Sequence, residues 1–249
     1  MNTHTDPDKT GGKKCRQTRD ALSMPSTMHL LQMTDSTFPV GTFSFSNGLE
    51  SAAFAGVVKN AADLREFVRS QAVQAAYSDG VAAIHAHRAF LRNDYDAIAE
   101  ADRALMRFKM NAEARLMLAR MGKKLAELSV RLFDCPAISR WLEDINAGTV
   151  PGSYPVGQGM AYAAAGVDEA AMFAAHQYGV INMVLSAALR MVRVSHYDTQ
   201  KILFELSSEI EGLYREAAEM KLSDMNAFFP QLDIMASLHE KGQMRMFMN

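Results

Sequence analysis

Cysteine is scarce in this chain. Its 249 residues include only two, Cys15 and Cys135, and neither has a second cysteine at the spacing of a metal site or a redox motif. A domain held together by disulfides needs several pairs, so a disulfide framework is excluded. Free thiols are typical of a reducing compartment. We therefore expect a cytoplasmic protein.

An excess of charge of one sign is also missing. The chain has 26 basic and 28 acidic residues, which gives a formal net charge of −2. Basic runs such as Lys13-Lys14 and Lys123-Lys124 are short, and the sequence suggests no basic stripe. Nucleic acids and anionic membrane surfaces are bound through such stripes, so neither partner is expected.

Long hydrophobic runs are absent as well. The most apolar stretch, residues 180–194, is interrupted by polar and charged residues, among them Asn182, Ser186 and Arg190. A bilayer-spanning helix needs roughly 20 predominantly apolar residues, so no membrane span is expected. Residues 1–27 are polar and lack the apolar segment of a secretory signal. We expect them to form a disordered leader.

Common catalytic motifs are missing too. The sequence contains no Gly-x-x-x-x-Gly-Lys-Ser/Thr phosphate loop, no Gly-x-Ser-x-Gly elbow and no His-Glu-x-x-His metal motif. On a helix, His85 and His87 would lie about 200° apart around the axis, so both cannot easily hold one ion. The sequence predicts no catalytic residue, no cofactor and no bound metal.

What the chain does contain is a series of amphipathic helical patterns. Apolar residues recur at steps of three and four after three good N-cap residues, Asn60, Asp94 and Asn111. Alternating patterns typical of strands are nearly absent, so the predicted class is all-α. The expected inward positions are Leu64, Phe67, Val68, Ala72 and Ala75; Ile98, Ala101, Leu105 and Phe108; and Leu118, Met121, Leu125, Leu128 and Leu132.

Two further helices complete the prediction. Residues 169–194 are apolar on nearly every side and rich in small residues, so we expect a buried central helix that others approach closely. Another long helix is expected from Thr199 to about Met220. The predicted architecture is a single bundle-like helical domain over residues 28–228, with a leader at 1–27 and a partner-binding tail at 229–249.

Residues 31–50 have the features of a sharp turn that leads into a helix. Pro39 fixes its own φ angle, and Gly41 can adopt backbone angles closed to other residues. Ser44 or Ser46 can then cap a helix that begins near Asn47.

Three other residues of this segment have expected places. Glu50 falls in the first turn of the helix, where the helix dipole favours a carboxylate. Phe43 and Phe45 are two residues apart near the turn, so one is expected to face the core and the other a partner.

The segment resembles the signature of the UreF family of urease accessory proteins, in which a proline-glycine turn precedes an aromatic-serine pair and then Gly-Leu-Glu. Here it reads LQMTDSTFPVGTFSFSNGLE. Residues 111–125, which include Gly122, resemble a Glu/Arg-rich helix of the family. The stretch from Tyr154 to Arg190 is similar to the family's central helix, and 233–247 to its tail. The resemblance covers roughly residues 28–247.

The chain departs from the family pattern at three places, one of which is Thr199, where the family has a glycine. Residues 193–196 read RVSH where the family often has Pro-Leu-Gly-Gln, and Gln243-Met244 replace a tyrosine-serine pair in the tail.

The resemblance implies a homodimeric adaptor, not an enzyme. Such an adaptor binds a UreD/UreH-type protein and the nickel-carrying GTPase UreG on apo-urease, so that UreG can supply nickel. The resemblance also implies the partner-binding residues: Pro39, Gly41, Phe43, Phe45, Gly48, Glu50, Arg190, His239, Glu240, Arg245 and Phe247.

The tail is expected to bind a partner and not to join the core, because the residues after Pro230 are few and mixed in character. Arg245 can make a forked bond to a carboxylate, and Phe247 can fill a pocket. Two alternatives to the adaptor stay open. One is a helical scaffold unrelated to nickel; the other is an all-helical metal-dependent enzyme that uses His85, His87, His176 or Asp198.

Overall fold

The computed structural model describes residues 22–41, 45–226, 232, 234, 235 and 237. This part of the chain is all-α and contains no strand, which confirms the predicted class. The elements are α1 Met24–Thr34, α2 Leu49–Phe54, α3 Ala61–Ala75, η2 Ala76–Gly80, α4 Val81–Leu91, α5 Tyr95–Phe108, α6 Ala112–Leu132, α7 Pro136–Ala147, α8 Tyr154–Ala164, α9 Glu169–Met191, α10 His196–Ser207, α11 Ile210–Glu219 and η3 Leu222–Asp224.

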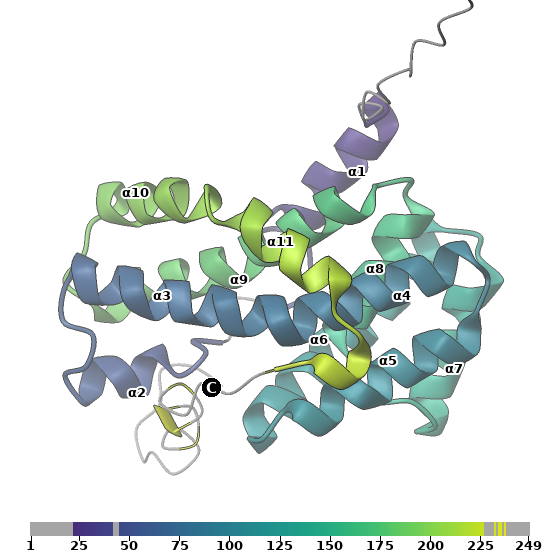
Figure 1. The fold of residues 1–249 in the computed structure, drawn as a ribbon, viewed down its shortest axis with the longest axis horizontal. Helices are drawn as coiled ribbons and strands as arrows, with labels where there is room; N and C mark the ends of the chain where they lie inside the picture. Colours follow the sequence, from purple (N-terminus) through teal and green to yellow (C-terminus); the bar gives the residue numbers. More distant parts are fainter. Residues whose placement is uncertain (1–21, 42–44, 227–231, 233, 236, 238–249) are drawn as a thin grey trace, which may run out of the picture.

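A long rod formed by α3, the π-helical segment η2 and α4 crosses the molecule (Figure 1). α3 packs on α9, and α4 packs on α5 and α8. The rod begins where the sequence predicts, because the Asn60 side chain accepts hydrogen bonds from the backbone N–H groups of Ala62 and Asp63. Asp94 and Asn111 cap α5 and α6 in the same way.

The core consists of two apolar clusters. The larger one lies mainly among α4 to α9 and includes the fully buried Trp141, Tyr162 and Phe173. The smaller one lies among α2, α3, α9 and α10 and includes Leu64 and Leu185. α9 contributes to both clusters, so it is the central helix that the sequence predicts. Of the described residues, only α9 is long and apolar enough to cross a bilayer, a test that a core helix also passes.

One strip of α9 is nevertheless open. Tyr178, Asn182, Ser186 and Arg190 follow one another at steps of four and are exposed or partly exposed, with Tyr178 40% exposed. The sequence shows Asn182, Ser186 and Arg190 only as interruptions of an apolar stretch and predicts a helix buried on nearly every side. We call these four residues the open strip of α9.

The predicted leader is too long. α1 begins at Met24, within the expected segment 1–27, because the Ser23 side chain accepts a hydrogen bond from the N–H of Ser26 and Pro25 lies in the first turn. Figure 1 shows α1 projecting from the bundle. Residues 1–21 lie outside the described part of the chain.

The long helix expected from Thr199 to Met220 is in fact two helices. α10 starts earlier, at His196, because Ser195 and Asp198 form a capping box. It ends at Ser207, and α11 begins at Ile210. The prediction missed the break because no proline or glycine marks it.

The predicted boundary of the tail is also wrong at one residue. Leu232 is only 6% exposed and belongs to the smaller core cluster, and Met235 packs against that cluster. The chain after Pro230 is therefore attached to the domain at Leu232.

Candidate partner-binding site

On both sides of residues 42–44, which lie outside the described part of the chain, the signature segment has backbone angles typical of turns. Gly41 has a φ of +90°, in the left-handed region that favours glycine. Asn47 and Gly48 follow with φ of +52° and +78°. The backbone carbonyl of Asn47 accepts a hydrogen bond of 2.8 Å from Nε2 of Gln71, which holds the turn against α3.

The helix after the turn starts later than predicted. α2 begins at Leu49, and its N-cap is Gly48 in the left-handed conformation, with no side-chain cap. The predicted cap by Ser46 is therefore wrong; Ser46 is buried instead, and Ser44 lies outside the described residues. The prediction that Glu50 occupies the first turn is confirmed.

The structure brings three of the predicted site residues to one region. Phe45 is 6% exposed and belongs to the larger core cluster, as predicted for one phenylalanine of the pair. Phe45 and Arg190 line the same hollow, beside the open strip of α9 and the loop that carries Val40. Pro39 is exposed next to that loop. We call this space, of about 50 Å³, the signature hollow.

Gly41 and Gly48 lie in the turn and Glu50 in the first turn of α2, and the remaining five predicted site residues are not described by the structure. Phe43, His239, Glu240, Arg245 and Phe247 lie outside the described residues. Their assignment to partner binding stays a prediction.

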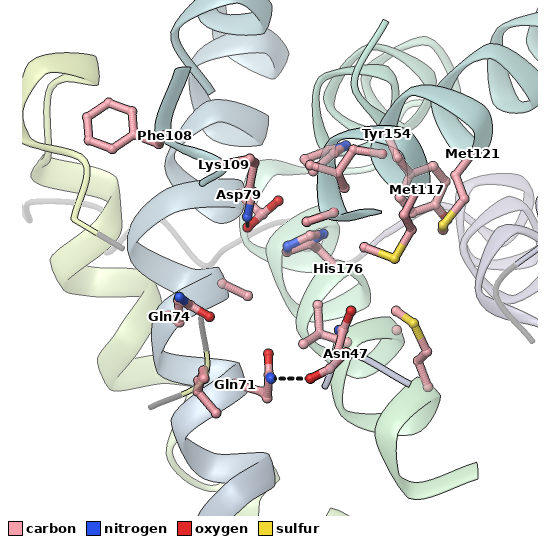
Figure 2. A pocket seen from close by; sticks show the side chains of 18 of the residues that line it. Asn47, Gln71, Gln74, Asp79, Phe108, Lys109, Met117, Met121, Tyr154 and His176 are labelled. Carbon is pink, nitrogen blue, oxygen red and sulfur yellow. Dashed lines mark hydrogen bonds and ion pairs between the residues drawn. The ribbon is translucent and has the colours of Figure 1, made fainter. Parts of the chain in front are cut away.

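A larger space, the polar cavity, adjoins the signature hollow (Figure 2). Its volume is about 120 Å³, and its walls come from α3, η2, α6, α8 and α9. The two spaces share the lining residues Tyr154, Gln158, Gly179 and Met183. Asn47 and Leu232 also line the polar cavity, so the signature turn and the start of the tail both border it.

An ion pair between Asp79 and Lys109 forms one wall of the polar cavity. Asp79 lies in the π-helical turn η2, a kind of distortion that is frequent at functional sites. Burial raises the pKa of Asp79, but Lys109 and His176 oppose it strongly enough to leave that pKa below its ordinary value. Asp79 is therefore charged, and the pair brings no net charge to the wall.

A chain of hydrogen bonds also lines the polar cavity. Nδ1 of His176 lies 2.8 Å from Oε1 of Gln158, and Nε2 of Gln158 donates to the Tyr154 hydroxyl at 3.3 Å. Because the amide of Gln158 offers its oxygen to His176, the imidazole proton is on Nδ1. Nε2 of His176 then presents a lone pair, and it is buried without a partner. The imidazole faces Asp79 and Lys109 (Figure 2).

His176 makes stability depend on pH. Burial lowers the pKa of His176 from 6.5 to about 4, which the nearby Asp79 only partly opposes. Between these values the unfolded chain binds a proton that the folded chain does not, so stability falls as the pH falls from 6.5 to 4. The loss over this range is up to about 3 kcal/mol.

Urea unfolding at a series of pH values measures this effect. His176→Gln should flatten the pH dependence between 6.5 and 4 relative to the parent chain. An unchanged pH dependence in the folded variant contradicts the assignment.

The remaining enzyme candidates have structural partners. Nε2 of His85 bonds to the carbonyl of Met220 and Nε2 of His87 to that of Val167, both at 2.9 Å. Asp198 is bound to Ser195 in the capping box of α10. Across the described residues no group of three or more His, Cys, Asp or Glu side chains is placed to hold a metal ion.

Sequence reasoning missed most of the polar cavity. It singled out His176 only as an enzyme candidate and did not single out Asp79, Lys109, Gln158 or Tyr154 for a site. The sequence carries no local signal for the π-helical turn that directs Asp79 inward.

Comparison with known proteins agrees with the signature. A family model for UreF matches residues 58–207. The chain is 48% identical to Urease accessory protein UreF 2 of Brucella canis over 227 residues, which covers 91% of this chain and 93% of the relative. It is 45% identical over 228 residues to Urease accessory protein UreF of Yersinia pseudotuberculosis. That match covers 92% of this chain and 100% of the relative. The chain therefore belongs to the UreF family of urease accessory proteins, which are not enzymes.

Proposed function

We propose that this protein is the adaptor that recruits a UreG-type GTPase, together with a UreD/UreH-type protein, to apo-urease for nickel insertion. It acts in the cytoplasm as a homodimer and takes no cofactor of its own. Urease maturation follows from membership of the family. The identity of these partners is our inference from the resemblance.

The observation that carries the proposal is the signature hollow. Phe45 and Val40 of the signature line it together with Arg190, although α9 is far from them in sequence. Phe45 and Val40 are buried and form the floor of this surface, whereas Arg190 is exposed, and arginine often anchors protein interfaces. The open strip of α9 extends this surface, so a partner segment can lie along the helix.

Regulation of the GTPase requires more than binding. A protein that binds both nucleotide states of UreG with equal affinity does not change the equilibrium between them. We therefore infer that this surface contacts one nucleotide state more favourably than the other.

Co-purification tests the proposal. The purified chain should co-elute with UreD/UreH-type and UreG-type proteins, and Arg190→Glu should weaken the complex at unchanged helical content. A folded parent chain that forms no complex with either protein would contradict the proposal.

Truncation tests the role of the tail. A cut after Ser237 keeps Leu232 and Met235 and should leave the melting temperature nearly unchanged, because both packed residues remain. It should nevertheless weaken capture of the UreD/UreH-type protein, because it removes His239, Glu240, Arg245 and Phe247.

A matched cut after Gln231 removes Leu232 and should also lower the melting temperature. Normal capture by the chain cut after Ser237 would show that residues 238–249 do not bind this partner.

A further inference from the structure

We propose that the exposed face of α6 binds an acidic segment of another protein, through four cationic side chains that lie on one side of the helix. These are Arg120, Lys123, Lys124 and Arg131, which we call the basic face of α6. The inference goes beyond the proposed function, because it concerns a surface other than the signature hollow and names the chemistry of its ligand.

Helix geometry brings the four residues together. Along the sequence Lys123-Lys124 is only a short basic run, but α6 is one continuous helix from Ala112 to Leu132. At about 100° per residue, all four basic residues fall within about 100° of one another around the helix axis. The face is roughly 17 Å long from Arg120 to Arg131. All four side chains are exposed, whereas the opposite side of α6 packs into the larger core cluster.

The charges of the basic face are not compensated within the chain. Between Arg120 and Arg131 the only acidic residue is Glu127, which lies 3.2 Å from Lys124. In the part of the chain that the structure describes, Arg120, Lys123 and Arg131 form no ion pair or side-chain hydrogen bond. This segment holds four basic residues and one acidic residue, so the rest of the chain holds 22 basic and 27 acidic residues. The face is therefore positive on an otherwise acidic molecule.

The arrangement also acts against the stability of the helix. Arg120 lies three residues before Lys123 and four before Lys124, and like charges at these spacings destabilise a helix. Local choices that oppose the fold without a compensating contact are expected at functional sites. An acidic partner would supply the compensating contact.

The chemistry of the face indicates the character of the partner segment. Arginine can form two parallel bonds to one carboxylate, and lysine adds a flexible point charge. Leu116 lies one turn before Arg120 on the same face and is 48% exposed, so it offers an apolar contact beside the charges. Opposite charges across an interface speed association and select the partner, and salt screens them.

A nucleic acid fits the basic face less well. α6 contains no aromatic residue on which a base could stack. Proteins held on a duplex by its phosphates commonly use about 6–10 such contacts, whereas this face supplies four cations and the rest of the chain is acidic. The observations therefore favour the separate carboxylates of a protein segment.

The experiment measures the binding of a dye-labelled octaglutamate peptide to the full chain by fluorescence anisotropy. The parent chain should bind the peptide saturably at about 0.01 M salt. The affinity should fall at least about tenfold at about 0.1 M salt, because the Debye length shrinks from roughly 30 Å to roughly 10 Å. No binding at low salt, or binding that does not weaken with salt, overturns the inference.

Two double variants with the same change of net charge locate the site. Arg120→Glu with Lys123→Gln should lower the affinity for octaglutamate at least about tenfold. It should stay folded, because a glutamate four residues before Lys124 is a favourable helix pair. Arg193→Glu with Lys201→Gln is the matched control: both residues are exposed and lie outside α6, and the affinity should fall less than about threefold. An equal loss in the two folded variants would show a response to net charge alone and overturn the inference.

A dye-labelled octathymidylate of the same length tests the nucleic-acid alternative. It should bind the parent chain more weakly than octaglutamate does. Tighter binding of octathymidylate would assign the face to nucleic acid and overturn the inference. All these measurements use the chain alone, so failure to form a complex with the maturation partners bears only on the proposed function.

Discussion

Gly122→Ala should lower the free energy of unfolding by at least about 2 kcal/mol and the melting temperature by roughly 4–8 °C. A Cβ at Gly122 would lie 1.9 Å from the carbonyl oxygen of Gly152 and 2.8 Å from the backbone nitrogen of Tyr154. These are backbone atoms, so no side-chain rotation relieves the clash. α6 can approach the loop before α8 this closely only with glycine at position 122.

The loop itself cannot move away easily. The buried carboxylate of Asp102 accepts hydrogen bonds from the N–H groups of Gly152 and Ser153 at 2.9 and 2.8 Å, and from Nε1 of Trp141. Moving the loop would break these bonds and leave Asp102 unpaired, which is costly for a buried carboxylate.

Thermal and urea unfolding of the parent and variant measure the effect. Gly212→Ala is the control and should stabilise the chain slightly, because alanine is favoured over an exposed helical glycine by about 1 kcal/mol. A Gly122→Ala variant as stable as the parent would show that α6 and the loop do not pack this closely.

Gly179→Leu should abolish capture of at least one maturation partner while leaving the melting temperature equal or higher. Gly179 lies on α9 at the junction of the signature hollow and the polar cavity, and it lines both. A Cβ added at Gly179 meets nothing within 4 Å, so the larger side chain is expected to occupy the space that both hollows share. Removing a glycine from a helix also lowers the entropy cost of folding, by about 0.5–1 kcal/mol.

Capture is measured by co-purification of the variant with the UreD/UreH-type and UreG-type proteins. Gly212→Leu is measured in parallel as the control. The control should capture both partners as the parent does, because Gly212 lies on α11, away from both spaces. If Gly179→Leu folds and captures both partners normally, the proposed surface on α9 is wrong.

The sequence predicts the helices well wherever local signals decide them. α3, α5 and α6 each begin after a capping side chain, and their apolar steps set the buried face. Leu132 is an exception: it lies in the last turn of α6 and is 48% exposed. A periodic pattern alone does not show where the neighbouring helices end.

The candidate site is less accessible to sequence reasoning, because it depends on contacts between distant segments. Gly41 and Gly48 could be singled out, since positive φ angles have a local residue preference. The pairing of Asp79 with Lys109 depends on η2 and on the end of α5. The open strip of α9 depends on which helices cover it, and its own residues do not encode that.

The central claim is that this chain serves nickel loading of urease by recruiting other proteins, without catalysis of its own. The most direct test is the nickel content and activity of urease in cells that produce its cognate urease and the other accessory proteins but lack this chain. The account predicts that the parent chain restores the nickel content and activity of urease, and that Gly212→Leu restores both equally. Gly179→Leu should restore neither, although it accumulates as a folded protein. Urease that is fully nickel-loaded without the chain, or equally activated by Gly179→Leu, would contradict it.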